Sequence, residues 1–571
     1  MDRHASEVAL ISSTITQFYQ ARTPFRVYHG STNSTRPSGK TRANTVDTSR
    51  LNNVLSVDPS SLIAIVEPNV PMDKLVQETV KHGVVPPVIM EFPGITAGGG
   101  FSGTSGESSS FRYGPFEETV EWIEIVLADG EVVRASATEN PDLFRGAASA
   151  FGTLGVITLL GVKLVQASPF VRLEYHLSRS FTEAVAKLLE ETDRDENHFV
   201  DAITFGKDST ITCTGHMVDE PPAENKRIQR FTRAKDPWFY LRVEEVAKRL
   251  QSSQSHGDIR TIVDYIPLAD YLFRYDRGAF WTGRYAFKYF LTPFNRITRR
   301  VLDPFLHTRV MYAALHKSGL AQFYLTQDVA VPFDRSVEFQ EWLDETYGIY
   351  PVWLCPLRIP KNGGDDTRTY TSGFWNPASR EVINFGVWGP LSFDEKEALR
   401  LNRLLEAKLV EMGGRKCLYA QTYSTEEEFW ANYDRKAYDA LREKYKASHL
   451  PSVYDKVKWH NPAEDALGKK SSVGRRLKDR VWDIWLVRGL YGVIKVLQGG
   501  DYILGKDKIK AVAVPVEKPP SALPEEVRRA EPTTENEIAD VSGNATAAEG
   551  TAGAPLDWQP SGQRKSTGTP S

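Results

Sequence analysis

The chain has 571 residues, of which 41% are hydrophobic and 25% are charged, a balance typical of soluble globular proteins. This composition excludes the collagen-like, fully disordered and multi-span membrane classes. Lys and Arg total 70 and Asp and Glu total 73, and this near balance predicts no nucleic-acid partner. The three cysteines, Cys213, Cys355 and Cys417, are too far apart for a disulfide framework or a zinc motif. We therefore expect a reducing compartment and no metal site.

Residues 1–25 are predicted to form a helical or loose leader that lacks a signal-peptide run. Short strands then alternate with helices over residues 26–168, which predicts an α+β domain. The clearest expected elements are a strand at 61–68, a helix at 72–83 closed by Gly83, a hairpin at 121–135 around Asp129-Gly130, a helix begun by Asn140 and Pro141, and a strand at 156–165.

Residues 169–460 also alternate between strand and helix patterns and are long enough for a second α+β domain, which would cover the substrate. Helices are expected over 305–315 and 394–414. Residues 511–571 are rich in Pro, Ala, Glu, Thr and Gly, and this composition predicts a disordered tail.

Between these regions, residues 461–510 combine a basic linker with an apolar stretch. Arg488 and Lys495 fall on one face of a helix over 481–497, which also carries tryptophans. A basic, Trp-bearing amphipathic helix is typical of a membrane surface, and no segment is long enough to span a bilayer. A helix packed on the protein's own surface explains the pattern equally well.

The most unusual segment is PGITAGGGFSGTSGESSSFRYG, residues 93–114, in which seven of 22 residues are glycine. Glycines let a backbone approach a ligand closely, and their N–H groups with Ser and Thr hydroxyls form an anion site suited to a pyrophosphate. A flexible linker is the alternative, but ordered elements flank the run closely. Residues 98–103 match GxGxxG, yet the pattern predicts no preceding strand and no following helix, so a Rossmann site is not expected.

Two further polar turns, YHGSTNSTR at 28–36 and FGTLGVIT at 151–158, accompany this segment. In this order and spacing, the three pieces resemble the flavin-binding domain of the vanillyl-alcohol oxidase and para-cresol methylhydroxylase superfamily. The motifs GTSGESSSFRYG, ENPDLFRGAASAFGTLG, DYIPLADYLFRYDRGAFW and YAQTYSTEEEFWANYD resemble the delta-24 sterol reductase branch. That resemblance runs from about residue 24 to 460.

The resemblance implies that three loops bind FAD. They consist of Gly30, Ser31, Thr32, Asn33 and Ser34; Gly98, Gly99, Gly103, Thr104, Glu107, Ser108 and Ser109; and Gly152, Thr153, Gly155 and Val156. Relatives with covalent flavin often carry a histidine in the first loop, where this chain has Asn33. We therefore expect noncovalent FAD, with attachment at His29 as the alternative.

The implied reaction is reduction of the C24–C25 double bond of a sterol or triterpenoid side chain, with NADPH as the electron donor. A proton would add at C24 and a hydride from flavin N5 at C25. Residues 481–497 could replace the N-terminal membrane segment of relatives, which implies a location on the cytosolic side of a membrane, in the endoplasmic reticulum. An oxidase acting on an alcohol or lactone, or a lipid-binding protein with a decayed flavin site, are the alternatives.

The proton donor is not fixed by the sequence. The candidates within the branch motifs are Tyr423, Tyr433, Glu428 and Asp276, and Arg277 could bind substrate or a cofactor phosphate. Each has a structural alternative: a packed tyrosine, a helix-capping glutamate, or an aspartate paired with a neighbouring arginine.

Overall fold

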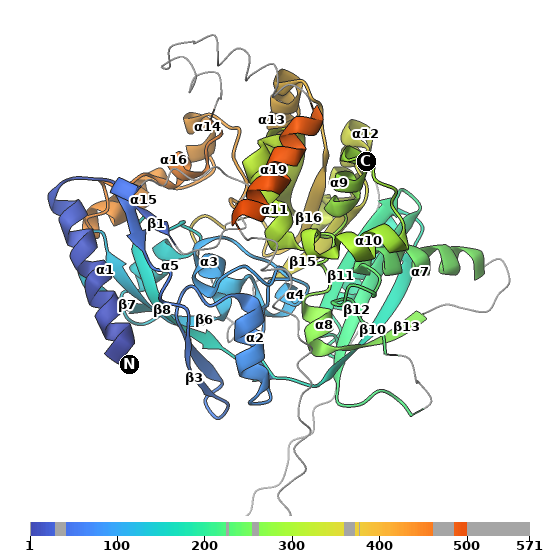
Figure 1. The fold of residues 1–571 in the computed structure, drawn as a ribbon, viewed down its shortest axis with the longest axis horizontal. Helices are drawn as coiled ribbons and strands as arrows, with labels where there is room; N and C mark the ends of the chain where they lie inside the picture. Colours follow the sequence, from blue (N-terminus) through green and yellow to red (C-terminus); the bar gives the residue numbers. More distant parts are fainter. Residues whose placement is uncertain are drawn as a thin grey trace, which may run out of the picture. The chain divides into compact units, whose positions relative to one another are not determined.

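The computed structural model describes residues 2–28, 42–223, 228–253, 262–358, 372–375, 377–460 and 485–499 (Figure 1). The chain divides into two units, residues 1–514 and 515–571, and the second lies outside the described residues. The predicted disordered tail and the basic cluster at 469–480 also lie outside them.

The leader is a helix, α1 (Asp2–Gln20), that belongs to the core. Its apolar positions follow helical spacing and bury Val8, Ile11 and Ile15. His4, one turn earlier, contacts Glu67 Oε1 at 3.0 Å and Glu124 Oε1 at 3.2 Å. The helix is thereby tied to the sheet of the first domain.

That sheet has five strands in the order β3-β4-β8-β6-β7, and all neighbours are antiparallel. Their bounds are β3 (Val54–Asp58), β4 (Ile63–Val66), β6 (Val120–Leu127), β7 (Val132–Ser136) and β8 (Gly155–Lys163). The predicted hairpin is confirmed, with Gly130 at φ +100° in its turn. Two small sheets pair β1 (Arg26–Tyr28) with β2 (Thr45–Asp47) and β5 (Val84–Val85) with β9 (Val165–Gln166).

Four helices belong to this domain: α2 (Met72–Val80), α3 (Ala97–Ser102), α4 (Ser110–Tyr113) and α5 (Pro141–Ala147). The predicted helix at 72–83 is confirmed, but it ends at Val80, before the left-handed Gly83. No helix was predicted to follow residues 98–103, and no local pattern indicated that a helix would form within them. Thr96 accepts a hydrogen bond from Gly99 N and begins α3 within the run itself.

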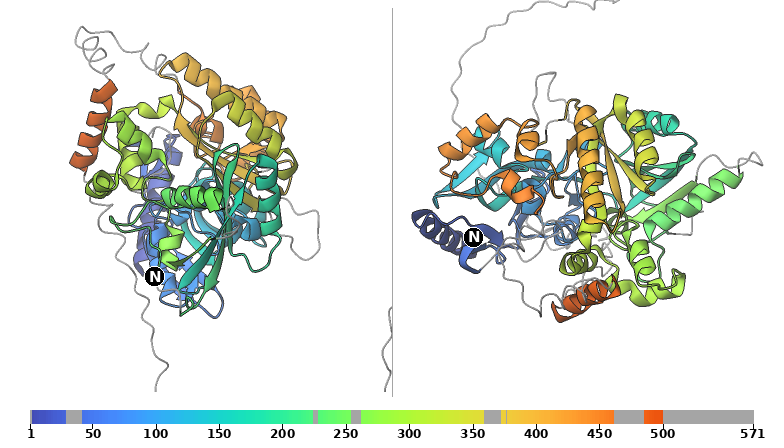
Figure 2. Two further views of the ribbon diagram at one scale, coloured as in Figure 1. Left: turned by 90° about the vertical axis from the view of Figure 1, so that its right-hand side faces the viewer. Right: turned by 90° about the horizontal axis from the view of Figure 1, so that it is seen from above.

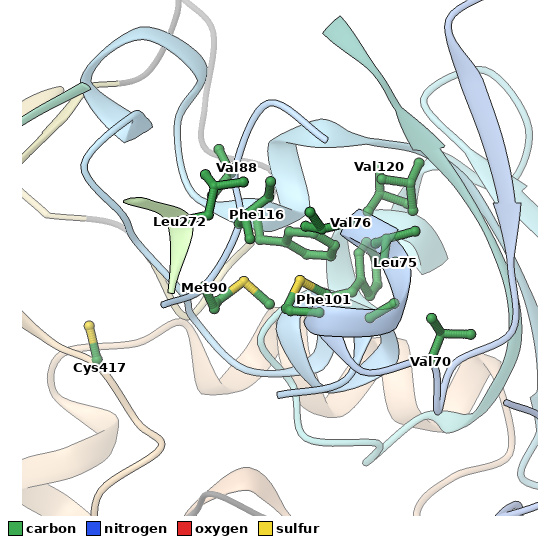
Figure 3. Packing of buried hydrophobic residues seen from close by; sticks show 14 of the residues in the cluster. Val70, Leu75, Val76, Val88, Met90, Phe101, Phe116, Val120, Leu272 and Cys417 are labelled. Carbon is green, nitrogen blue, oxygen red and sulfur yellow. The ribbon is translucent and has the colours of Figure 1, made fainter. Parts of the chain in front are cut away.

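Packing explains the glycine at the centre of α3. A Cβ atom on Gly100 would lie 2.5 Å from Met90 Cε and 2.8 Å from Phe116. Figure 3 shows Met90 and Phe116 close to Phe101, with Leu75 and Val76 of α2 behind them. The glycine-rich segment is therefore held by a dense apolar core.

The second sheet has eight strands in the order β13-β10-β12-β11-β15-β16-β14-β17, again antiparallel throughout. Their bounds are β10 (Phe170–Ser178), β11 (Phe199–Gly206), β12 (Ser209–Val218), β13 (Ile262–Pro267), β14 (Tyr324–Pro332), β15 (Val352–Arg358), β16 (Glu381–Pro390) and β17 (Arg415–Lys416).

Three helices, α6 (Phe181–Thr192), α12 (Ser336–Tyr347) and α13 (Glu395–Glu411), cover one face of this sheet through a shared apolar cluster. On β16, Ile383, Phe385 and Val387 belong to that cluster, whereas Asn384 and Trp388 line a cavity. Because side chains alternate along a strand, the opposite face of the sheet is left for the cavity.

The remaining helices are α7 (Phe239–Ser253), α8 (Leu268–Leu272), α9 (Thr282–Tyr289), α10 (Arg296–Leu302), α11 (Thr308–Ser318), α14 (Glu426–Trp430), α15 (Arg435–Lys444), α16 (Val453–Val457) and α19 (Trp485–Gly499). The segment α14–α16 returns to the first domain, where Phe429 and Trp430 cluster with Ala150. Lys446 Nζ reaches Asp129 Oδ2 at 2.6 Å in the same region. The range 169–460 therefore includes residues that pack on both sheets.

A buried ion pair within the second domain also reaches the glycine-rich segment of the first domain. Arg274 Nη2 donates to Asp201 Oδ2 at 2.8 Å and to Ser108 Oγ at 3.3 Å. The same Asp201 oxygen also accepts from Tyr275 and Trp353. Both charged side chains are about 1% exposed or less, so each depends on the other for its compensation.

We expect Asp201→Asn to lower the free energy of unfolding by about 3–5 kcal/mol, because it leaves a buried guanidinium without its counter-charge. Denaturant unfolding followed by tryptophan fluorescence measures the change. Asp193→Asn is the matched control, since this carboxylate is 65% exposed and pairs with Arg358 at the surface. Its loss should cost at most about 1 kcal/mol. Equal effects of the two substitutions would contradict the assigned importance of the buried pair.

Candidate active site

A cavity of about 390 Å³ has walls from both domains. One wall is formed by the glycine-rich segment, by the turn at 151–157 and by Arg26, Val27 and Lys456. The other wall comes from the second sheet and from α11. A ligand in this cavity would therefore contact both domains.

The glycine-rich wall allows unusually close approach. Gly98 N donates to Pro68 O at 2.8 Å, and a Cβ atom on Gly98 would lie only 2.6 Å from Pro68 Cβ. Further along, the backbone N–H groups of Thr104, Ser105 and Gly106 make no hydrogen bond within the described part of the chain. Consecutive free N–H groups in a glycine-rich loop suit the phosphate oxygens of a ligand.

Positive charge is available at the same wall. Gly152 has φ +68°, which turns the backbone there, and Lys456 Nζ donates to Phe151 O at 2.8 Å and to Gly152 O at 3.1 Å. Arg26 also lines the cavity. These features fit a dinucleotide with a pyrophosphate.

The opposite wall is aromatic. Phe280 lies 4.4 Å from Trp388 and 5.3 Å from Trp353 between ring centroids, and Phe92 lies 5.8 Å from Tyr312. All five rings line the cavity. Such a wall excludes water, and its ring faces can stabilise a cation.

One acidic group is embedded in this wall. Asp328 on β14 accepts a hydrogen bond from the Tyr419 hydroxyl and another from Asn384 Nδ2 at 2.8 Å. Burial raises the pKa of Asp328 to about 6, although these hydrogen bonds oppose the shift. Gly386 stands opposite Asp328 in the sheet, and a Cβ atom there would lie 2.6 Å from Trp388. The glycine thus makes room for the indole beside the carboxyl group.

A pair of carboxyl groups, Glu91 and Glu107, also lines the cavity. Glu91 and Glu107 are both buried, and Glu91 N donates to Glu107 Oε1 at 3.2 Å. Burial raises the pKa of Glu91 to about 7, and burial together with Glu91 raises the pKa of Glu107 well above its usual range. Glu117 lies behind the cavity wall, where burial raises its pKa to about 8 and its Oε1 accepts from Ser149 at 3.0 Å.

The structure brings together many of the predicted cofactor-binding residues. The cavity is lined by Gly98, Gly99, Gly103, Thr104, Glu107, Gly152, Gly155 and Val156. Ser108 and Ser109 line a separate small pocket beside Arg274, and Thr153 is buried behind the wall. The first loop, Gly30, Ser31, Thr32, Asn33 and Ser34 with His29, lies outside the described residues.

The five predicted catalytic candidates do not line the cavity among the described residues. Asp276 contacts His307 Nδ1 at 2.5 Å and accepts from Thr308 N at 3.1 Å, which holds the start of α11. Although burial disfavours the charged ring, Asp276 raises the pKa of His307 to about 9. Arg277 also makes structural hydrogen bonds: its Nε donates to Asp303 Oδ1 at 2.7 Å and its Nη1 donates to Phe231 O at 3.1 Å.

The other three candidates also have structural partners. Glu428 closes the capping box of α14 with Thr425 and bonds Arg403 at 2.9 Å. Tyr423 stacks with Trp459, and Tyr433 packs against Phe374 and Phe429. Their catalytic roles remain predictions without a contact to the cavity.

The sequence patterns did not predict several of the residues that line the cavity. Asp328, Asn384 and Tyr312 sit in apolar strand or helix patterns, where one polar residue carries no local mark of function. Tyr419 is the first residue of the YAQTY motif, whereas the predicted candidate, Tyr423, is the last. Lys456 comes from α16, far along the chain from the turn it contacts. The one usable indication in the sequence was the alternation of side chains along β14 and β16, which places Asp328 and Asn384 on the face opposite the apolar cluster.

Comparison with known proteins gives a consistent result. A family model described as FAD binding domain matches residues 4–136. The delta(24)-sterol reductase of Homo sapiens is 31% identical over 423 residues, which cover 71% of this chain and 76% of the human protein. The Mus musculus protein of that name is 29% identical over the same share of each chain, and that of Pisum sativum is 28% identical over 72% of this chain and 76% of the pea protein.

We expect Gly98→Ala to reduce the affinity for FAD at least about tenfold, because the added methyl group must displace Pro68. We call the glycine-rich wall of the cavity, residues 98–106, the cradle. Visible flavin absorbance of the purified protein, followed by titration with FAD, measures this loss. Gly373→Ala is the matched control, since a Cβ atom there would meet nothing within 4 Å. Full flavin occupancy in Gly98→Ala would show that the cradle does not hold the cofactor.

Proposed function

Because the chain belongs to the delta(24)-sterol reductase family, we propose that this FAD-dependent oxidoreductase reduces the C24–C25 double bond of a sterol or related triterpenoid side chain. NADPH is the proposed electron donor. The observation that carries the proposal is a single cavity that joins a glycine-rich cradle to an aromatic wall containing a buried carboxyl–tyrosine pair. An apolar alkene and a flavin fit opposite walls of such a cavity.

The cradle residues are assigned to noncovalent FAD. Gly98 and Gly103 permit close approach, and Lys456 and Arg26 supply positive charge for the phosphates. Within the described part of the chain, the N–H groups of residues 104–106 donate to no other acceptor. Bound FAD, once reduced by NADPH, would supply the hydride that completes the reduced side chain.

The protein must supply the proton, since an isolated alkene is electron-rich and is not attacked by hydride alone. Asp328 is the proposed acid and Tyr419 the proposed relay. In the reacting state the protonated Asp328 Oδ2 donates to Tyr419 Oη, the reverse of the hydrogen bond in the structure, so its proton moves to Tyr419 Oη as the Tyr419 proton moves to C24. The positive charge then develops at C25, where Trp353, Trp388 and Phe280 exclude water and present their ring faces.

The substrate class also bears on location. Sterols and triterpenoids partition into membranes, so we place the activity at a membrane surface facing the cytosol, in the endoplasmic reticulum. Among the described residues, no helix combines the length and the apolar character needed to cross a bilayer.

An anaerobic absorbance titration tests the reaction. NADPH should bleach the flavin of the purified protein, and a sterol with a C24–C25 double bond should then restore its colour with one equivalent of saturated product. The same sterol lacking the double bond is the control and should restore nothing. If only oxygen restores the colour, the oxidase alternative replaces the reductase.

The proton relay predicts a defined dependence on pH. The active carboxyl group is protonated, so kcat/KM should be flat below the Asp328 pKa of about 6 and fall about tenfold per pH unit above it. Asp328→Asn and Tyr419→Phe should each lower kcat/KM by about 10²–10⁴-fold, with flavin absorbance retained.

Tyr433→Phe is the comparison variant for this series, because it removes a buried tyrosine hydroxyl outside the cavity. It should keep its activity within about twofold if the relay is correct. Loss of activity in Tyr433→Phe with retention in Tyr419→Phe would reverse the assignment and restore the candidate taken from the sequence motif.

A further inference from the structure

Large hydrophobic side chains are exposed mainly in two short segments. Leu291, Ile297 and Val301 are 79%, 76% and 70% exposed, and Leu490, Ile494 and Leu497 on α19 are 46%, 49% and 42% exposed. Together with Tyr491, they make up half of the large exposed hydrophobic residues in the described structure. We call the six aliphatic residues the docking face.

The two segments are neighbours. A Cβ atom on Gly489 of α19 would lie 2.9 Å from Phe290, and Gly489 N donates a hydrogen bond to the Tyr289 hydroxyl at 3.2 Å. Leu291 follows directly in the chain. Figure 2 shows α19, in orange-red, beside the yellow-green α9–α11 segment in both views. The two exposed segments therefore adjoin each other where Gly489 meets Tyr289 and Phe290.

The inner face of α19 is already occupied. Gly492 packs so closely on α11 that a Cβ atom would lie 2.7 Å from Ala314 O, and Lys317 Nζ donates to Lys495 O at 3.5 Å. Packing on the protein's own surface thus accounts for one side of the helix. It leaves Leu490, Ile494 and Leu497 on the other side.

The charge around the docking face has one sign. Residues 282–302 contain Arg284, Lys288, Arg296, Arg299 and Arg300, residues 485–499 contain Arg488 and Lys495, and neither segment contains Asp or Glu. No carboxylate of the described residues forms an ion pair with Lys288, Arg296 or Arg300. Exposed aliphatic side chains ringed by cations match an anionic lipid surface, with apolar chains below and negative headgroups above.

We propose that the docking face inserts into the interface of an anionic bilayer, with α10 and α19 lying in its plane. The length of α19, about 22 Å for 15 residues, suits this orientation. The face also lies over the cavity, because α11 contacts α19 through Ala314 and contributes Tyr312 to the aromatic wall. A substrate dissolved in the membrane would reach the protein beside α11, the helix that contributes Tyr312 to the cavity wall.

Vesicle flotation of the full chain tests the proposal without any turnover. The protein should float with vesicles of phosphatidylcholine and phosphatidylserine in equal parts, and much less with phosphatidylcholine alone or at high salt. Ile297→Asp/Val301→Asp and Arg296→Glu/Arg300→Glu should each lower the partition coefficient at least about tenfold. Leu10→Asp is the matched control, an exposed leucine on α1 that should leave binding unchanged.

Three results would overturn the proposal: no flotation with anionic vesicles, equal flotation of Ile297→Asp/Val301→Asp and the unmodified protein, or a dimer that this double substitution dissociates in the absence of vesicle binding. The last result would assign the face to a second copy of the chain. Turnover of detergent-dispersed sterol, measured in parallel, separates this inference from the proposed reaction. Ile297→Asp/Val301→Asp should retain that turnover and lose turnover of sterol presented in vesicles.

Discussion

The buried pair of Arg274 and Asp201 is the interaction on which the arrangement of the site depends. Arg274 reaches Ser108 at the end of the glycine-rich segment, while Asp201 belongs to the second sheet and accepts from Trp353 in the aromatic wall. Two charges removed from water are tolerated only when their geometry is closely satisfied. The pair therefore fixes the spacing between the two walls of the cavity more strictly than apolar packing alone would.

The two faces of the second sheet have different roles: one packs under the helices and the other lines the cavity. Odd-numbered positions of β14 and β16, such as Val329 and Phe385, pack under the covering helices, whereas Asp328 and Asn384 face the cavity. Period-two alternation lets one strand serve both purposes without a loop entering the core. The helices that cover the sheet are thus what allows a carboxyl group to be held in a rigid, apolar wall.

Much of the fold follows from local patterns in the sequence. The hairpin at Asp129-Gly130 and the glycine-rich segment carry strong local preferences, and that segment lines the cavity. The predictions failed where tertiary contacts determine the local structure. The helix α3 forms within a glycine run because Thr96 caps it and Met90 and Phe116 pack against it. Asp328 was missed because a single acid within an apolar strand is distinguished only by the sheet around it.

The buried carboxyl groups have an electrostatic consequence for the cavity as a whole. Glu91 and Glu107 line it and Glu117 lies behind it, and burial shifts all three toward the neutral form near neutral pH. The potential at the glycine-rich wall is then set largely by Arg26 and Lys456, whereas Asp328, with a pKa of about 6, carries its negative charge on the other wall. A dianionic pyrophosphate at the glycine-rich wall therefore meets attraction. At alkaline pH Glu91, Glu107 and Glu117 would ionise one after another, and their negative charges would repel the phosphates of the cofactor.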